Sequence, residues 1–181
     1  MSVVAFDVGI KNLAYCQSRG NDKEYKLEKL GLICLESDKK QFDVLANSLF
    51  GNLSSHFDLA EIDTVLIENQ PVKINPTMKS IQMMIYSFFF LKNCKVKIVS
   101  AGNKTSLLNR LPQSEVETIT AKLTLSSKYA NTKRLAVLLA DSFLSKHDTD
   151  QHQSYLKMKK RDDVADAFLM TINYCNAFQI I

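Results

Sequence analysis

Near its amino-terminal end the chain reads Val3-Val4-Ala5-Phe6-Asp7-Val8-Gly9. A short apolar run that is closed by an aspartate and a glycine is typical of a central strand buried on both faces. An extended pattern resumes at residues 13–17 and again at residues 25–35, after a break at residues 9–12. These three segments predict an antiparallel meander of three strands.

The remainder of the chain alternates between helical and extended patterns. Apolar spacing predicts helices over residues 38–57, 76–92, 131–146 and 161–178, and short strands over residues 64–67 and 96–99. Pro76 suits the first turn of its helix, and Asn131 is expected to cap the third helix. Three sequential strands followed by alternating helices and strands predict an α/β fold, with a five-stranded mixed sheet flanked by helices on both sides. The length predicts a single domain over residues 1–181.

Composition limits the class of protein. The 181 residues are 46% hydrophobic and 23% charged, which is the ordinary balance of a globular domain with its own core. The net charge of +4 is a weak indication of a polyanionic partner. The polar segments at residues 101–130 and 145–161 are long for plain connectors, so we expect substrate-covering loops with some helix of their own. Four widely spaced cysteines without a zinc pattern predict reduced thiols and an intracellular protein, and no apolar segment is long enough to span a membrane.

Four acidic side chains stand where such a fold would bring them together. Asp7 ends the first buried strand, Glu68 ends the fourth, and Asp163 and Asp166 share one side of the last helix. If the strands of Asp7 and Glu68 are neighbours, the four carboxylates meet in one small volume, where like charges disfavour joint ionisation. Hard divalent cations such as Mg²⁺ resolve that conflict. A pair of these ions can activate a water for attack on a phosphodiester.

Each acid also has an ordinary structural interpretation. An aspartate at a strand end commonly begins a turn, which describes Asp7 taken alone equally well. Acids in a first helical turn favour the positive end of the helix dipole, as Asp162, Asp163 and Asp166 would. Glu68 is harder to explain in this way, because a charge that ends an apolar strand tends to lie in a functional crevice. A joint metal site is therefore favoured over four separate explanations.

Three blocks of sequence surround these acids: Phe6–Asn12 (FDVGIKN), Ile67–Pro71 (IENQP) and Lys160–Phe168 (KRDDVADAF). In this order, and over nearly the whole chain, they resemble the motifs of the RuvC-like Holliday junction resolvases of poxviruses and other large DNA viruses. The resemblance implies the ribonuclease-H-like fold. It also implies an endonuclease that nicks paired strands of a four-way DNA junction and leaves a 5′ phosphate.

The same resemblance assigns roles to individual residues. It implies two Mg²⁺ ions, for which Mn²⁺ would substitute, and catalytic metal-binding acids at Asp7, Glu68, Asp163 and Asp166. Asp162 is the alternative in a shifted register, and Lys133 is the best match for a catalytic basic residue near the scissile phosphate. Polar and basic residues near these blocks could hold phosphates, with solvated turns or surface as the alternative. They are Lys11, Asn12, Gln70, Lys73, Lys104, Arg134, Lys159, Lys160 and Arg161.

The helix expected around Met78–Asn93 is apolar in nearly every direction. Such a helix is buried on more than one side. Its outer side could pack against a second copy or beneath the long polar segment. In resolvases that this chain resembles, the dimer is built largely from this helix. The resemblance therefore implies a homodimer whose two sites cut two strands symmetrically.

Other functions stay open at this point. A nuclease of the same fold that acts on RNA or on an RNA–DNA hybrid would use the same acids. A non-catalytic binder of branched DNA would use the basic residues, although four acids disfavour binding alone. An actin-like ATPase is disfavoured because the sequence lacks a second glycine-rich phosphate loop. If the chain is viral, we expect it at the host-cell site of viral DNA replication.

Overall fold

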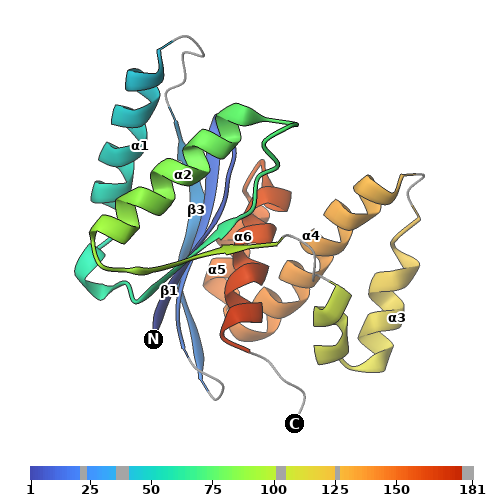
Figure 1. The fold of residues 1–181 in the computed structure, drawn as a ribbon. Helices are drawn as coiled ribbons and strands as arrows, with labels where there is room; N and C mark the ends of the chain where they lie inside the picture. The colour runs from blue at the N-terminus through green and yellow to red at the C-terminus, as the bar shows by residue number, and fades with distance from the viewer. Residues whose placement is uncertain (21–23, 36–40, 101–104, 125–126, 177–181) are drawn as a thin grey trace.

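The computed structural model describes residues 1–20, 24–35, 41–100, 105–124 and 127–176. A five-stranded sheet with helices on both faces forms the body of the molecule (Figure 1). The antiparallel meander predicted at the start of the chain is present, and two parallel strands extend it. The strands are β1 (Ser2–Asp7), β2 (Asn12–Gly20), β3 (Tyr25–Cys34), β4 (Thr64–Glu68) and β5 (Lys95–Val99), in the spatial order β3-β2-β1-β4-β5. The prediction of a mixed five-stranded α/β sheet is confirmed.

Helices cover the two faces of this sheet unequally. They are α1 (Phe42–His56), α2 (Pro76–Leu91), α3 (Gln113–Ala121), α4 (Lys128–His147), α5 (Thr149–Leu156) and α6 (Arg161–Tyr174), with 3₁₀ turns η1 (Leu59–Glu61) and η3 (Thr105–Arg110). In Figure 1, α1 and α2 lie on one face, α4, α5 and α6 lie on the other, and α3 lies farthest from the sheet. In the described part of the chain no helix is long and apolar enough to cross a membrane.

Strand β1 separates two apolar clusters. Val4 and Phe6 belong to the cluster beneath α1 and α2, whereas Val3 and Ala5 belong to the cluster beneath α4 and α6. All four side chains are fully buried. A strand covered on both faces needs apolar residues at every position, which explains the continuous run in the sequence. The four cysteines, all within described residues, are free thiols.

Several helix boundaries differ from the prediction. Helix α4 begins at Lys128 and contains Asn131, because the Ser127 hydroxyl accepts the backbone N–H of Ala130 (3.0 Å) and caps the helix a turn earlier. Helix α5 lies in the polar segment 145–161, for which some helix was expected but no bounds were predicted. Helix α1 begins at Phe42 and α6 ends at Tyr174. Residues 38–40 and 177–178 of those two predicted helices lie outside the described residues.

Candidate metal centre

The ends of β1 and β4 set the first two acids side by side. The strands run parallel with Phe6 opposite Ile67, so the next residues, Asp7 and Glu68, leave the same end of the sheet as neighbours. Burial raises the pKa of Asp7 well above its usual range, and the hydrogen bond and charge of Glu68 raise it further. Without a cation, these surroundings therefore favour the protonated form of Asp7.

The turn after Asp7 has no room for a side chain at Gly9. A Cβ atom at that position would lie 2.2 Å from the backbone oxygen of Asn12, which is far inside van der Waals contact. Glycine therefore allows the tight reversal from β1 to β2. The reversal returns Asn12 to the same end of the sheet, where it lines one cavity with Asp7.

Helix α6 brings the other two acids to this place. Its apolar side, which includes Val164, Ala165 and Phe168, is buried in the core, and the helix contacts β1 and β2. Asp163 and Asp166 thereby join the first two acids in lining a cavity of about 680 Å³. The charges of Asp166 and Asp163 contribute to the raised pKa of Asp7, and burial raises the pKa of Asp163 as well.

Four acids and two bases line the cavity. Its other lining residues are Val8, Gly9, Asn12, Met78, Ser100, Tyr129, Thr132, Lys133 and Lys160. Four carboxylates, with no histidine or cysteine among the lining residues, fit a hard divalent cation such as Mg²⁺. Among the described residues, no three acidic, histidine or cysteine side chains already form a closed metal-binding cluster. The four carboxylates instead line one open cavity.

Lys133 reaches the acids from α4. Its Nζ forms an ion pair with Asp162 and lies 3.7 Å from Oδ1 of Asp163. The hydrogen bond to Asp162 raises the pKa of Lys133, so this side chain stays charged. Burial raises the pKa of Asp162, but the hydrogen bond and charge of Lys133 outweigh it and leave that pKa lowered. Asp162 is thus paired with Lys133, whereas Asp163 lines the cavity. This arrangement favours Asp163 over the alternative Asp162 as the cavity acid.

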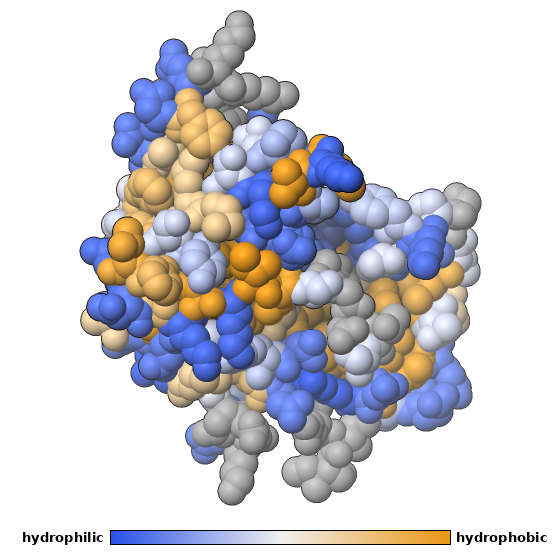
Figure 2. All heavy atoms as spheres, in the orientation of Figure 1, coloured by the Kyte–Doolittle hydropathy of each residue, from blue (hydrophilic) through white to orange (hydrophobic). Residues whose placement is uncertain are grey.

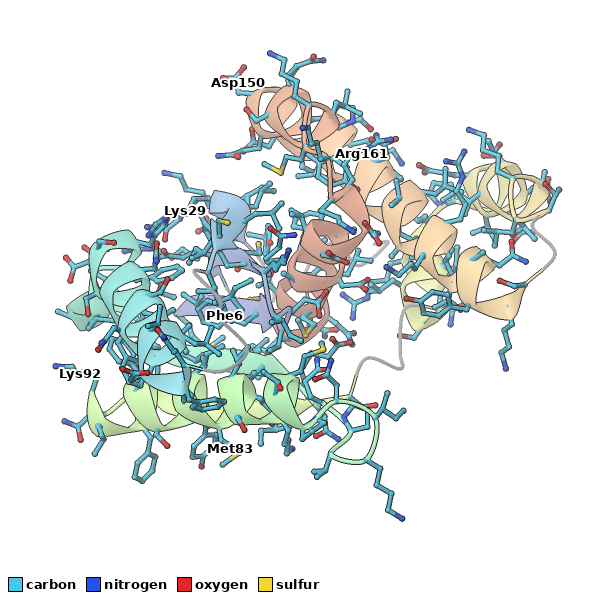
Figure 3. The ribbon with its side chains drawn as sticks, turned by 90° about the horizontal axis from the view of Figure 1, so that it is seen from above. Phe6, Lys29, Met83, Lys92, Asp150 and Arg161 are labelled. Carbon is cyan, nitrogen blue, oxygen red and sulfur yellow. The ribbon has the colours of Figure 1, made fainter. Side chains whose placement is uncertain are left out.

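The nine residues expected to hold DNA fall into several groups. Asn12 and Lys160 line the cavity. Arg161 lies at the start of α6 (Figure 3), with its guanidinium 5.9 Å from the ring centroid of Tyr155. Lys104 lies outside the described residues. Four of the nine are exposed but do not line the cavity, namely Lys11, Lys73, Arg134 and Lys159.

Gln70 differs from the expected phosphate contact. Its side chain is buried, at 6% exposure, and its Nε2 donates to Oε2 of Glu68 (3.1 Å). Its backbone N–H donates to Oε1 of Gln82 on α2 (2.9 Å). The side-chain amide of Gln70 is therefore engaged with an acid of the cavity and does not face solvent.

Several residues of the cavity wall were not predicted from the sequence, and Tyr129 is one of them. Its side chain is 72% exposed, and Nζ of Lys133 lies 5.5 Å from its ring centroid. Tyr129 and Lys133 are four residues apart on α4 and so share a helix face. Recognising Ser127 as the helix cap would have placed both on the same wall. Met78, at the start of α2, and Ser100, just beyond β5, have no comparable signal in the sequence.

The sequence matches a known protein family. Residues 1–177 match the family described as Poxvirus A22 protein. An uncharacterised protein of Acanthamoeba polyphaga mimivirus is 30% identical over 125 residues, which are 65% of this chain and 30% of that protein. The chain thus spans less than a third of the mimivirus protein's length.

Solved structures share the fold. The fowlpox virus Holliday junction resolvase has a TM-score of 0.66 at 20% identity, with 98% of this chain and 99% of that chain covered. The yeast mitochondrial Holliday junction resolvase Ydc2 has a TM-score of 0.57 at 16% identity, with 97% and 83% covered. These likenesses confirm the ribonuclease-H-like fold. On the match across residues 1–177, the chain belongs to the poxvirus A22 protein family.

Proposed function

We propose that this protein is a divalent-metal-dependent endonuclease that resolves four-way DNA junctions by paired symmetric nicks. The observation that carries the proposal is the convergence of Asp7, Glu68, Asp163 and Asp166 on one cavity. Membership of the poxvirus A22 family supports it. A fowlpox virus resolvase solved with Holliday junction DNA, which has a TM-score of 0.65 to this chain at 21% identity and covers 98% of both chains, also supports it.

In this proposal the four carboxylates hold two Mg²⁺ ions, for which Mn²⁺ substitutes. When bound, the ions supply an activated water and stabilise the leaving 3′ oxygen of the phosphodiester. The protein contributes the buried carboxyl of Asp7, which gives up its proton when the site is loaded. Lys133 and Lys160 on the cavity wall place positive charge where the scissile phosphate would lie.

The test is cleavage of a synthetic four-way junction, with a linear duplex and an RNA–DNA hybrid as competing substrates. We expect symmetric cuts in the junction that leave 5′ phosphates in Mg²⁺ or Mn²⁺ and no cuts in EDTA. The variants Asp7→Asn and Asp163→Asn should lose cleavage and retain junction binding, because basic residues carry the affinity. Asp43→Asn, an exposed acid at the start of α1, is the matched control.

Other outcomes would assign another function. Preferred cutting of the hybrid would make the protein a ribonuclease of the same fold. Junction binding without cleavage in either metal would make it a structural binder of branched DNA. Full cleavage by Asp7→Asn in matched metal and salt would refute the metal centre itself.

We also propose that two copies pair through the outer face of α2. On this helix Met83, Phe90 and Leu91 are 42%, 60% and 77% exposed. Figure 2 shows apolar residues along α2 on the face in view, and in Figure 3 Met83 points away from the body of the molecule. Contiguous exposed apolar side chains mark an interaction surface. A two-fold dimer would present two cavities to two strands of one junction, at the host-cell site of viral DNA replication.

Light scattering of the purified chain tests this pairing. The wild type should be a dimer, and Phe90→Glu should be a folded monomer that nicks single strands without coordination. Phe42→Glu, at a similarly exposed position on α1, should remain a dimer. A monomeric wild type that still makes paired cuts would refute the pairing.

A further inference from the structure

We propose that Gln82, a buried residue of α2, is a positioning residue that acts on Glu68 through Gln70. The inference rests on the proposed metal centre. Gln82 is 0% exposed and lies among apolar residues of α2 such as Ile81 and Ile85. Burying an amide is unfavourable unless its hydrogen bonds are made. The contacts that Gln82 makes should therefore show why a polar residue stands there.

Gln82 fixes the backbone at the point where β4 leaves the sheet. The N–H of Asn69 still donates to the backbone oxygen of Val99 across the sheet (2.8 Å). The next N–H, that of Gln70, donates to Oε1 of Gln82 (2.9 Å). Within the described residues, Nε2 of Gln82 has no hydrogen-bond partner. The side chain thus acts as an acceptor, and it binds the main chain two residues after Glu68.

Lys79, one helical turn before Gln82, holds the same segment from outside. Its Nζ donates to Oε1 of Gln82 (3.0 Å) and to Oδ1 of Asn69 (3.2 Å). Gln82 and Lys79 of α2 therefore hydrogen-bond to the two residues that follow Glu68, which are Gln70 and Asn69. The position of α2 along the sheet sets where this segment lies.

Gln70, whose backbone is fixed by Gln82, also hydrogen-bonds to Glu68 through its side chain. Its Nε2 donates to Oε2 of Glu68 (3.1 Å), on the side chain that contacts Asp7. Two neighbouring carboxylates repel each other when both are charged, and Glu68 would rotate away unless something held it. The Gln70 amide supplies that hold, and hydrogen-bonded partners of metal-binding side chains commonly set metal affinity.

A purely structural role for Gln82 makes a different prediction. If Gln82 only satisfies a buried N–H, its loss lowers the melting temperature and leaves metal binding by the folded protein unchanged. If Gln82 positions Glu68, its loss weakens metal binding by the folded protein. Metal affinity measured without DNA separates the two roles, because it does not depend on junction binding or on turnover.

The experiment titrates Mn²⁺ and Mg²⁺ by calorimetry into the wild-type chain and five variants, of which Glu68→Gln tests the metal centre itself. Gln82→Leu and Gln70→Met remove the acceptor and the amide donor, and Gln82→Glu keeps the acceptor and gains a charge partner in Lys79. Gln17→Leu is the matched control, because Gln17 is a buried glutamine on β2, three residues along that strand from the partner of Asp7. We expect Gln82→Leu and Gln70→Met to bind metal about 10–100-fold more weakly. Gln82→Glu and Gln17→Leu should stay close to wild type.

Each outcome decides a separate point. Wild-type metal affinity in folded Gln82→Leu and Gln70→Met would overturn the positioning role and leave the metal centre intact. If Gln82→Leu does not fold, Gln82→Met, which also lacks the acceptor, takes its place in the same titration. If Glu68→Gln also binds metal as the wild type does, the proposed metal centre fails, and that failure is recognised independently of Gln82.

Discussion

Replacing Asp7 by asparagine should make the metal-free protein more stable at neutral pH. Asp7 is an acid whose pKa in the folded protein is raised, first by burial and then by the hydrogen bond and charge of Glu68. The folded state therefore holds a proton that the unfolded chain releases near its ordinary pKa of about 3.9. As pH rises above that value, the unfolded state is favoured and stability falls, until Asp7 also ionises in the folded state. Asparagine carries no such penalty at any pH.

The size of the effect follows from the same shift. Each unit by which the pKa of Asp7 is raised corresponds to about 1.4 kcal/mol of lost stability at neutral pH. For a chain of this length, 1 kcal/mol moves Tm by about 2–4 °C. Asp7→Asn should therefore raise Tm in EDTA by roughly 3–6 °C for each such unit. The gain should vanish as the pH approaches 4, where the unfolded Asp7 is also protonated.

Thermal melts of wild type and Asp7→Asn across pH, with and without Mg²⁺, make the measurement. With saturating Mg²⁺ the wild type should melt at a higher temperature than Asp7→Asn. The metal stabilises the ionised wild-type site, whereas the variant has one carboxylate fewer to bind it. Asp43→Asn, on the exposed start of α1, should change stability by no more than about 0.5 kcal/mol. An Asp7→Asn protein that melts at or below wild type in EDTA at pH 7 would refute the electrostatic account of the cavity.

Three further changes test other parts of the structure. Lys133→Met should lower junction cleavage by about 10²–10³-fold in a single-turnover assay with little loss of junction binding, since it removes one cation from the cavity wall; wild-type cleavage would contradict this role. Arg110→Ala should destabilise the protein by about 1–3 kcal/mol in urea melts, because its guanidinium donates to the backbone oxygen of Ile172 (3.1 Å) at the end of α6; an unchanged midpoint would contradict it. Gly9→Ala should lower Tm and abolish the stabilisation by Mg²⁺, since its Cβ would meet the Asn12 oxygen; retention of both would show that the turn rearranges freely.

Much of the fold was predictable because a strand that is buried on both faces of a sheet has a continuous run of apolar residues in the sequence. The apolar runs at Val3–Phe6 and Thr64–Ile67 predicted buried strands, each ended by an acid. The sequence left open whether these strands are neighbours, and their parallel pairing in the structure places Asp7 and Glu68 at the same end of the sheet. The spacing of Asp163 and Asp166 placed both on one side of α6 in the same way.

The remainder depended on contacts between distant segments, which leave a weaker pattern. Helix α5 has only Tyr155 buried, so its sequence shows no apolar repeat. Helix α4 starts a turn before the predicted cap Asn131, because the Ser127 side chain caps it, and the predicted later start left Tyr129 outside the helix. The contact between Gln70 and Gln82 joins residues twelve apart, and polarity alone suggests that both face solvent.

The acids of the cavity are contributed by residues as far apart as Asp7 and Asp166. During synthesis on the ribosome, β1 and β4 emerge long before α6, so a nascent chain can pair its first two acids while one wall of the cavity is still missing. Contacts between such distant positions also form slowly in folding. Translation that stops short of α6 would thus release a sheet fragment with two of the four carboxylates, which lacks the other half of the proposed metal centre.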